Sequence, residues 1–356
     1  QKQIGLPRER LLLACSHTHY GPECRPDKAL FFNIPPDYAA KLPGVAQRLA
    51  DALIRVIVES TRNTVPAKLI ARRASARVAH NRRRGGIKDA VASPEDLVDN
   101  DVPILDVIST ETDLRKAIVF GYACHNTTIP LDDYRYCADW AGFAKEQLER
   151  LNSGATALFI TGCGADQNPE PRGSVELSKE YGVELANAVQ AAMIRDEGNE
   201  ITGPIRAAYE EVPLAMKPLT QQALDAMLAS DDPPKQVKAD FLLEQIKRGQ
   251  PLLMTYPAPI QAIGFGDQLL MLALPGEPVV DWARKVKHEF AGDFKEVWVA
   301  GYCNDMFGYL PTRRIQTEGG YEGGRAQLWN RLPSEWTDDV EDRITAGIGR
   351  TVARIS

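Results

Sequence analysis

Residues 11–22 read Leu-Leu-Leu-Ala-Cys-Ser-His-Thr-His-Tyr-Gly-Pro, a short apolar run that ends in two histidines and a Gly-Pro pair. The apolar residues predict a buried strand. Because alternate residues of an extended chain point the same way, His17 and His19 are expected to project side by side where this strand ends. Histidine is the commonest metal ligand, so the pair indicates either a metal site or two hydrogen-bonded imidazoles at a turn.

Two further apolar runs end in residues of the same kind. Residues 116–124 form a strongly β-prone run that leads directly to His125, and residues 270–274 lead through Pro-Gly to Glu277. Three strands that end at one edge could place two imidazoles and a carboxylate on a single ion. Such a ligand set, with one position open for water, is typical of zinc hydrolases.

The order of four short motifs carries a resemblance to a known family, the neutral ceramidases. The family's Thr-His-Thr-His-Ser-Gly-Pro motif, second histidine strand, Pro-Gly-Glu and Asn-x-Tyr-x-x-Tyr-x-Thr-Thr stretch resemble, in turn, residues 16–22, 121–125, 274–277 and 301–312. The Tyr-Glu pair that follows in the family matches Tyr321-Glu322. The resemblance extends over nearly the whole chain, although it is thin between the motifs.

The resemblance implies one catalytic Zn²⁺ held by two histidines, a glutamate and a tyrosine, which in this sequence are His17, His125, Glu277 and Tyr309. It places His19 beside the metal, where His19 and Tyr309 would contact the substrate or stabilise the oxyanion. Residues 79–83, Ala-His-Asn-Arg-Arg, resemble an Asn-Arg segment of the family and put Arg82 at the pocket as a substrate-binding residue. A solvated basic loop is the alternative for this arginine run.

One departure from the family pattern concerns the serine of its Gly-Asp-x-Ser-Pro-Asn stretch. The corresponding residues 159–169 keep the glycines and the Asn-Pro pair but contain no serine. Gln167 and Asn168 fall nearest to that position, and neither can act as a serine-like nucleophile. We therefore expect a zinc-bound water to attack, since zinc lowers the pKa of water to about 7. Asp166 is then the candidate base, with turn chemistry as its alternative, while Gln167 and Asn168 are candidate hydrogen-bond donors to the substrate.

The pattern along the chain predicts an α/β fold with mixed β-sheets flanked by helices, like the catalytic domain of neutral ceramidases. The motifs span most of the 356 residues, so residues 1–356 are expected to form a single domain. A charged helical hairpin, inserted over residues 219–249, is expected to be a lid, an oligomer contact or a plain solvated insertion. Helical spacing predicts the other helices at 38–62, 140–151, 176–194, 281–290 and 338–355.

The composition limits the classes of partner that the protein is expected to bind. The net charge of -6 argues against nucleic acid, and no apolar run has transmembrane length. A small-molecule substrate is expected, such as a lipid amide, an amino sugar or a glycan conjugate. None of the six cysteines forms a Cys-x-x-Cys pair, and Cys24 and Cys137 could form a disulfide in an exported protein.

The resemblance also bears on location and assembly. Related proteins work outside the cytoplasm, so a periplasmic or secreted location is expected. They carry strands and helices ahead of the first motif and an immunoglobulin-like domain after the last one, and this sequence shows neither. Since open sheet edges are usually covered, we expect a separate N-terminal segment or a homo-oligomer to cover them.

The leading interpretation is a zinc-dependent hydrolase that uses a metal-bound water on an amide or related carbonyl bond of an N-acyl substrate, not necessarily ceramide. The missing serine equally allows a carbohydrate-active or ester-cleaving metalloenzyme, hydrolase or lyase, on the same zinc site. An interpretation of another class is a binding protein with a vestigial metal site, whose ligand set would be closed.

Overall fold

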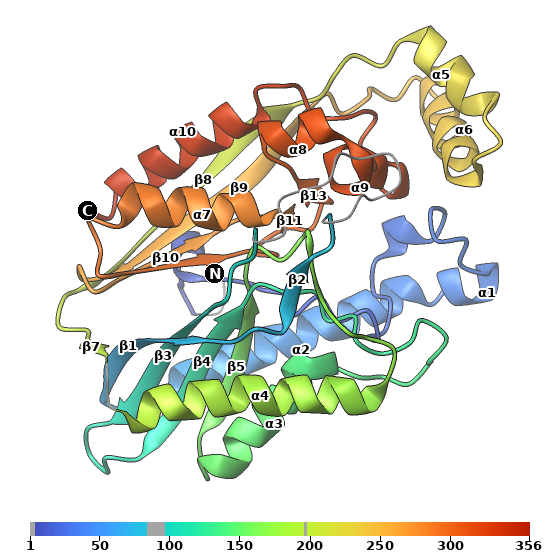
Figure 1. The fold of residues 1–356 in the computed structure, drawn as a ribbon. Coiled ribbons are helices and arrows are strands. Elements are labelled where there is room, and N and C mark those ends of the chain that lie inside the picture. The colour runs from blue at the N-terminus through green and yellow to red at the C-terminus, as the bar shows by residue number, and fades with distance from the viewer. Residues whose placement is uncertain (1–3, 84–96, 196–197) are drawn as a thin grey trace.

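Two mixed β-sheets form the centre of the molecule in the computed structural model, which describes residues 4–83, 97–195 and 198–356 (Figure 1). One sheet has the strand order β5-β4-β3-β1-β7, and the other has the order β12-β10-β9-β8. The β4–β5 and β10–β12 pairs are parallel, and the other pairs are antiparallel. The strands of the first sheet are β1 (Ala67–Ser75), β3 (Asp101–Ser109), β4 (Arg115–Tyr122), β5 (Thr156–Thr161) and β7 (Asn199–Glu200). Those of the second are β8 (Ile205–Ala215), β9 (Thr255–Phe265), β10 (Leu269–Ala273) and β12 (Glu296–Ala300).

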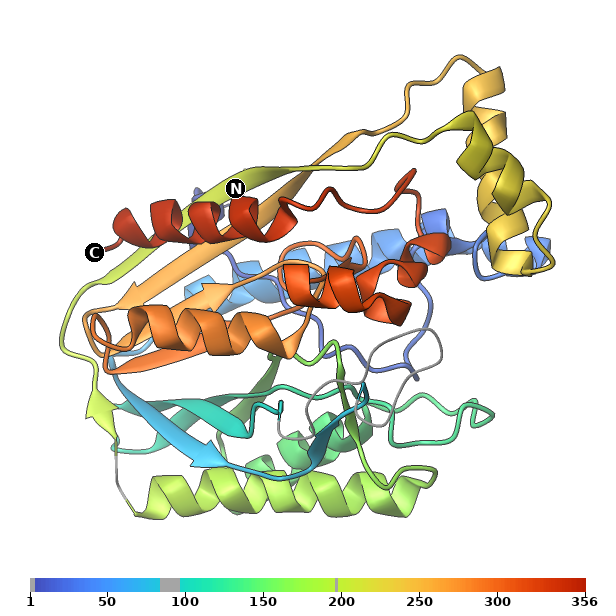
Figure 2. The same cartoon turned by 45° about the horizontal axis from the view of Figure 1, so that its top comes forward.

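The two sheets pack face to face between two layers of helices (Figures 1 and 2). The helices α3 (Asp139–Leu151) and α4 (Val175–Ile194) cover the outer face of the five-stranded sheet. The helices α7 (Val280–Phe290) and α10 (Val340–Ala353) cover the outer face of the four-stranded sheet. The four layers therefore run helix, sheet, sheet, helix.

Strand β10 is apolar on both faces because each face packs in a different core. Leu270 and Leu272 pack in the core that includes α7 and α10, whereas Met271 and Ala273 pack in the core between the two sheets. Successive side chains of a strand point to opposite faces, so a strand buried between two layers is apolar at every position. This confirms the predicted strand over residues 270–274, and β4 likewise confirms the predicted strand over 116–124.

A glycine permits the close approach of the sheets next to the second histidine strand. A Cβ atom on Gly121, in β4, would lie 2.8 Å from both Cζ2 and Nε1 of the Trp298 indole, which comes from β12 of the opposite sheet. The indole is fully buried. The absence of a side chain at Gly121 therefore sets the distance between the layers at the end of β4.

The predicted strand at Leu11–Ala14 is wrong. These residues form no regular strand, and Leu13 is 41% exposed. The segment crosses the ends of both sheets, and its described pairing consists of single bridges: Ala14 with Cys303, Thr18 with Asn126 and Tyr20 with Cys137. Because the bridging partners lie in loops rather than in one neighbouring strand, no continuous ladder can form.

The predicted helices agree with the observed ones, with shifts at their ends. Residues 38–62 contain the end of α1 (Pro36–Ala39) and α2 (Leu42–Arg62), and the other predicted ranges match α3, α4, α7 and α10. Helix α2 leaves Leu49, Leu53 and Val56 exposed. The expected covering segment or second copy stays a prediction.

A helical hairpin leaves the second sheet between β8 and β9. It consists of α5 (Gln221–Leu228) and α6 (Pro233–Lys247), and it extends beyond the sheet in both views (Figures 1 and 2). Leu224, Ala239 and Leu242 form a small core of its own. Within the described residues, no helix is long and apolar enough to cross a bilayer. All six cysteines are free thiols, so Cys24 and Cys137 are not bridged.

The remaining elements are short, and two pairs of strands among them carry candidate site residues. The pair β2 (Ala79–Asn81) and β6 (Gln167–Pro169) is antiparallel, and the pair β11 (Glu277–Pro278) and β13 (Tyr309–Leu310) is parallel. The short helices are η1 (Arg8–Arg10), η2 (Pro26–Lys28), α8 (Arg313–Glu318), α9 (Gly320–Gly323) and η3 (Arg325–Trp329).

Candidate functional site

Three histidines and a glutamate converge where β4 and β10 end. His17 Nε2 lies 3.2 Å from Glu277 Oε2 and 3.2 Å from His19 Nε2, and His125 Nε2 lies 3.6 Å from Glu277 Oε2. The ligand atoms of His17, His19 and His125 all lie within 4.8 Å of one another. These three histidines could hold a metal ion.

The His17 backbone, rather than an extended strand, brings the two neighbouring histidines together. His17 has φ +57°, in the left-handed region that a residue other than glycine seldom occupies. Asn126, next to His125, fixes the residue before this turn, because its Nδ2 donates to the Ser16 carbonyl at 2.5 Å. The predicted side-by-side projection of His17 and His19 therefore arises through a strained turn.

His125 is oriented by backbone carbonyls. Its Nδ1 lies 2.7 Å from the Gly164 oxygen and 3.1 Å from the Gln167 oxygen, so Nδ1 carries the proton and donates. This leaves the lone pair of Nε2 facing Glu277, as in metal-binding histidines whose other nitrogen is hydrogen-bonded. Burial and the Arg82 charge lower the pKa of His125 to about 4, and burial and His17 lower the pKa of His19 to about 3. Both imidazoles are neutral at neutral pH, which is the form that binds metals.

The carboxylate of Glu277 shows whether the histidine cluster suits a cation. Burial alone would raise the pKa of Glu277, but His17 and His125 hold it well below its usual range. Its Oε2 is buried and makes no hydrogen bond within the described part of the chain. A buried ionised oxygen costs several kcal/mol unless it is paired, by order of magnitude. An ion held by this oxygen and the neighbouring imidazoles would satisfy it, so the residues fit Zn²⁺.

Tyr309 and Arg82 lie on the other side of Glu277. The parallel β11–β13 pair puts Tyr309 opposite Glu277, and Arg82 Nη2 donates to the Tyr309 hydroxyl at 3.0 Å. Burial raises the pKa of Tyr309 well above its usual value, although Arg82 opposes the shift, so the phenol keeps its proton. Of the two candidates for a fourth ligand, His19 lies in the histidine cluster and Tyr309 hydrogen-bonds Arg82.

Glu322 supports this arginine and is a residue that sequence reasoning did not assign to the site. Its Oε1 accepts from Arg82 Nε at 2.7 Å, and its Oε2 accepts from the fully buried Arg83 Nη1 at 2.6 Å. Arg82 and Arg83 are therefore not part of a solvated basic loop, because both guanidinium groups bind one buried carboxylate, whereas Arg84 of the same run lies outside the described residues. The Tyr-Glu match to the family was the signal that could have found Glu322.

Asp166 is buried away from solvent and has two donors. Its Oδ1 accepts from the Val280 amide at 2.8 Å and its Oδ2 from Asn81 Nδ2 at 3.2 Å. Burial raises the pKa of Asp166 to about 6, although the Val280 amide opposes the shift. These contacts join the start of α7 to β2.

Gln167 and Asn168 differ in how their side chains are used. The Gln167 amide nitrogen donates to the Ala123 oxygen at 2.6 Å, and its Oε1 accepts from the Asp99 amide at 2.8 Å. Gln167 therefore braces the loops that hold His125. Asn168 Oδ1 is buried without a hydrogen-bond partner among the described residues. The predicted contacts of both residues with substrate stay untested.

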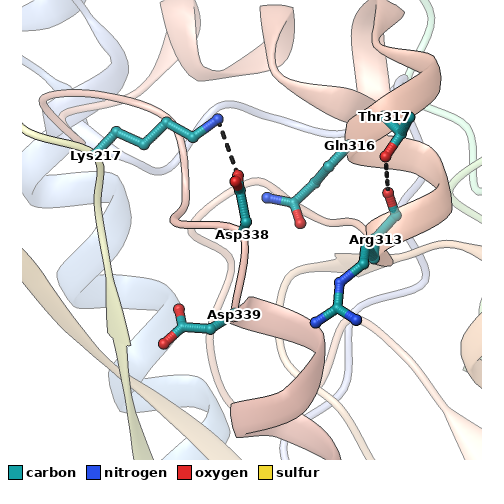
Figure 3. Close-up of a pocket in the computed structure, with 6 residues that line it drawn as sticks. All are labelled: Lys217, Arg313, Gln316, Thr317, Asp338 and Asp339. Atoms are coloured by element: carbon teal, nitrogen blue, oxygen red, sulfur yellow. Dashed lines mark hydrogen bonds and ion pairs between the residues drawn. The ribbon is translucent and has the colours of Figure 1, made fainter.

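A shallow hollow of about 630 Å³ lies elsewhere on the molecule (Figure 3). None of the predicted site residues lines it, and its Lys217 is paired with Asp338 at 3.2 Å. The other two charged lining residues, Arg313 and Asp339, pair with Asp342 and Arg343, which do not line the hollow. Among its lining residues the buried atom without a hydrogen-bond partner is the neutral Gln316 Oε1, whereas in the histidine cluster it is a carboxylate oxygen of Glu277. Its lining residues are Lys217, Arg313, Gln316, Thr317, Asp338 and Asp339.

Comparison with known proteins identifies the fold. No family model matches the sequence, and no curated protein does. A solved structure described as a ceramidase complexed with C2 superposes with a TM-score of 0.67 at 19% sequence identity, over 98% of this chain and 64% of that one. Neutral ceramidase from Pseudomonas aeruginosa superposes with a TM-score of 0.66 at 19% identity, over 98% of this chain and 62% of that one. The chain has a neutral-ceramidase-like α/β fold and spans less than two thirds of the length of these neighbours.

Proposed function

We propose that this protein is a zinc-dependent hydrolase of an amide or related carbonyl bond in an N-acyl substrate. The observation that carries the proposal is the buried Glu277 Oε2, which has no hydrogen bond and lies 3.2 Å from His17 Nε2 and 3.6 Å from His125 Nε2. The ceramidase-like fold supports the hydrolase class, although fold alone does not determine activity.

The ion would be held by His17, His125 and Glu277, with Tyr309 or His19 as the fourth ligand. A bound Zn²⁺ supplies a Lewis acid that polarises a carbonyl and makes water acidic enough to react at neutral pH. His125 is kept in the ligating tautomer by the Gly164 oxygen, 2.7 Å from its Nδ1.

The protein groups around the cluster suit an acyl-transfer reaction. The Tyr309 phenol keeps its proton and can donate to a developing oxyanion, and Arg82 adds a fixed positive charge behind that phenol at 3.0 Å. Glu322 holds Arg82 in place through a 2.7 Å contact with Nε. His19, neutral in the cluster, can form a hydrogen bond with the substrate or with the developing oxyanion.

We assign Asp166 a supporting role within this proposal. Its two oxygens already accept from Val280 and Asn81, and burial raises its pKa to about 6. A carboxylate with both oxygens engaged is a weaker general base than one that faces the substrate. Asp166 then stabilises the loops around the site. The attacking group is the zinc-bound water proposed above, so the reaction needs no serine nucleophile.

A second candidate function is N-acyl hydrolysis on an amino sugar. The Tyr321 ring lies 5.2 Å from that of Tyr309, and the Trp329 ring lies 5.7 Å from that of Tyr321. This line of aromatic rings leads outward from the candidate metal site, and Tyr321 is 36% exposed. Aromatic faces of this kind suit the flat face of a sugar ring. Ester hydrolysis and a lyase reaction remain alternatives on the same site.

The metal content of the purified protein tests the proposal first. The protein is stripped with EDTA, reloaded with Zn²⁺, dialysed and measured by mass spectrometry. We expect about one equivalent of zinc in the wild type and far less in His125→Ala and Glu277→Gln. His288→Ala, on the exposed side of α7, is the matched control and should keep its zinc.

Acetate release from acetamide and N-acetylglucosamine is then followed with the zinc-loaded protein. Release that disappears in both ligand variants but persists in His288→Ala supports the hydrolase. A protein that binds no zinc contradicts the proposal. Bound zinc without an exchangeable water in an X-ray absorption spectrum would instead identify the closed site of a binding protein.

A further inference from the structure

A buried lysine joins the helical hairpin to the segment beside the candidate site. Lys238, on α6, is 2% exposed, and its ammonium group contacts three backbone carbonyls. Its Nζ lies 3.0 Å from the Gln327 oxygen and 2.6 Å from the Asn330 oxygen, and it also donates to the Leu332 oxygen. An ammonium group has three donors and no acceptor, so three carbonyls satisfy it completely.

A second lysine binds the same stretch of backbone from another direction. Lys28, in η2, is 7% exposed, and its Nζ donates to the Trp329 oxygen at 3.0 Å. Two amines from segments far apart in sequence thus hold residues 327–332 through four carbonyl contacts. Burial lowers the pKa of both lysines, and Lys28 adds to the shift of Lys238. Two buried amines directed at one six-residue stretch therefore fix its backbone beside the candidate site.

The stretch that the lysines hold carries one end of the aromatic line. The Trp329 ring contacts Tyr321, and Tyr321 contacts Tyr309 beside Glu277. The Arg82 guanidinium lies 5.8 Å from the ring centres of both Tyr309 and Tyr321. A set of ring contacts therefore leads from Trp329, within the stretch that Lys238 and Lys28 hold, through Tyr321 to the candidate metal site.

Two more contacts fasten the hairpin to the same region. The rings of Phe241 on α6 and Phe31 after η2 lie 5.2 Å apart, and Arg325 Nη2 lies 3.1 Å from Asp232 Oδ2 at the start of α6. The hairpin that extends beyond the sheet in Figure 2 is thus anchored by its second helix. These contacts tie α6 to residues 325–332, while the expected roles of the hairpin as a lid, an oligomer contact or a solvated insertion stay predictions.

We propose that Lys238 is a positioning residue that fixes residues 327–332 and thereby holds Tyr321 and Trp329 as the wall that selects a substrate with a pyranose ring. The choice of substrate rests on the proposed hydrolase function, whereas the anchoring does not. A methionine in place of Lys238 would keep the length of the side chain and remove all three donors. Arginine would keep the charge and the donors.

Hydrogen exchange of the zinc-loaded full chain tests the anchoring. Lys238→Met should speed amide exchange in residues 325–332 by about tenfold, because opening a segment by 1.4 kcal/mol raises exchange by that factor. Lys247→Met, at the exposed end of the same helix, should leave the exchange unchanged. Lys238→Arg should restore most of the protection. Unchanged exchange in Lys238→Met overturns the anchoring.

A second variant keeps the test decisive if Lys238→Met does not fold. Lys28→Met removes only the Trp329 contact, and it should speed exchange at residues 328–331 by a smaller factor. If Lys28→Met exchanges like the wild type while Lys238→Met is unfolded, the shared anchoring of the stretch is wrong.

Calorimetric titration with N-acetylglucosamine tests the selection. The wild type should bind the sugar, while Trp329→Ala and Lys238→Met should bind it at least about tenfold more weakly, a loss of about 1.4 kcal/mol. Zinc content should not change in either variant. Absence of binding in the wild type overturns the choice of substrate. Failure of the hydrolase proposal is recognised separately, by missing zinc or turnover, because neither the exchange nor the titration depends on catalysis.

Discussion

The Asp166→Asn variant gives a quantitative test of the buried frame of the site. Burial raises the pKa of the Asp166 carboxyl from 3.8 to about 6. The folded protein therefore keeps this proton over a pH range in which the unfolded chain has lost it, so Asp166 makes the protein less stable as the pH rises through 6. The full difference corresponds to about 3 kcal/mol, since one pKa unit is about 1.4 kcal/mol.

The measurement is the free energy of unfolding in urea, for wild type and variant, at a series of pH values. About 2 kcal/mol of the effect falls between pH 4.5 and 7.5, so the stability of the wild type relative to Asp166→Asn should fall by that amount over this range. All other titrating groups are shared and cancel in the difference. The lost bond between Asn81 and Asp166 adds a constant of about 1 kcal/mol, which does not change with pH.

A difference between the two proteins that is flat with pH would refute the reasoning, because it would mean that the Asp166 carboxyl titrates as it does in water. The same variant separates two roles. Asp166 contacts none of the candidate ligands directly, so Asp166→Asn should keep its zinc. Turnover reduced far below that of the wild type, with zinc retained, would restore Asp166 as a participant in the chemistry.

The other predictions concern the ligands and the packing around them. His17→Ala should lose zinc and activity together, and a full equivalent of zinc in the purified variant would contradict the ligand assignment. Gly121→Ala should destabilise the protein by about 1–3 kcal/mol in urea unfolding, because its Cβ would lie 2.8 Å from the Trp298 indole. In a Trp298→Phe background the same change should be much milder, and an equal cost there would exclude the clash as the cause. Glu322→Gln should cost about 3 kcal/mol, because it leaves Arg83, whose side chain is fully buried, without a carboxylate at 2.6 Å; an unchanged melting temperature would show that Glu318 compensates.

Local pattern was sufficient for the strands that carry His125 and Glu277. β4 and β10 are apolar at successive positions because each lies between two layers, and such runs are visible in the sequence. The amphipathic helices were likewise visible from their spacing. Leu11–Ala14 misled the same reasoning, because an apolar run forms a strand only where a continuous partner strand lies beside it, and here the partners are two loops.

Part of the candidate site could be predicted from the sequence, but from the family resemblance and not from local pattern. The resemblance to neutral ceramidases supplied His17, His125, Glu277 and Tyr309, and the structure brings the first three together. The left-handed turn at His17 could not be predicted, because its strain is imposed by distant contacts such as that of Asn126 with Ser16. The pairing of Glu322 with Arg82 joins residues 240 positions apart, and no local pattern encodes it.

The candidate ligands come from separate layers of the molecule, and this has a thermodynamic consequence. His125 follows a strand of one sheet, Glu277 follows a strand of the other, and His17 lies on the segment that crosses both. An ion shared by all three would bind only the native chain, so mass action would add its binding free energy to folding. At a free zinc concentration about a thousand times the dissociation constant, that contribution is about 4 kcal/mol. The supply of zinc would then set the fraction of molecules that remain folded, and zinc starvation would expose this protein to proteolysis as well as inactivate it.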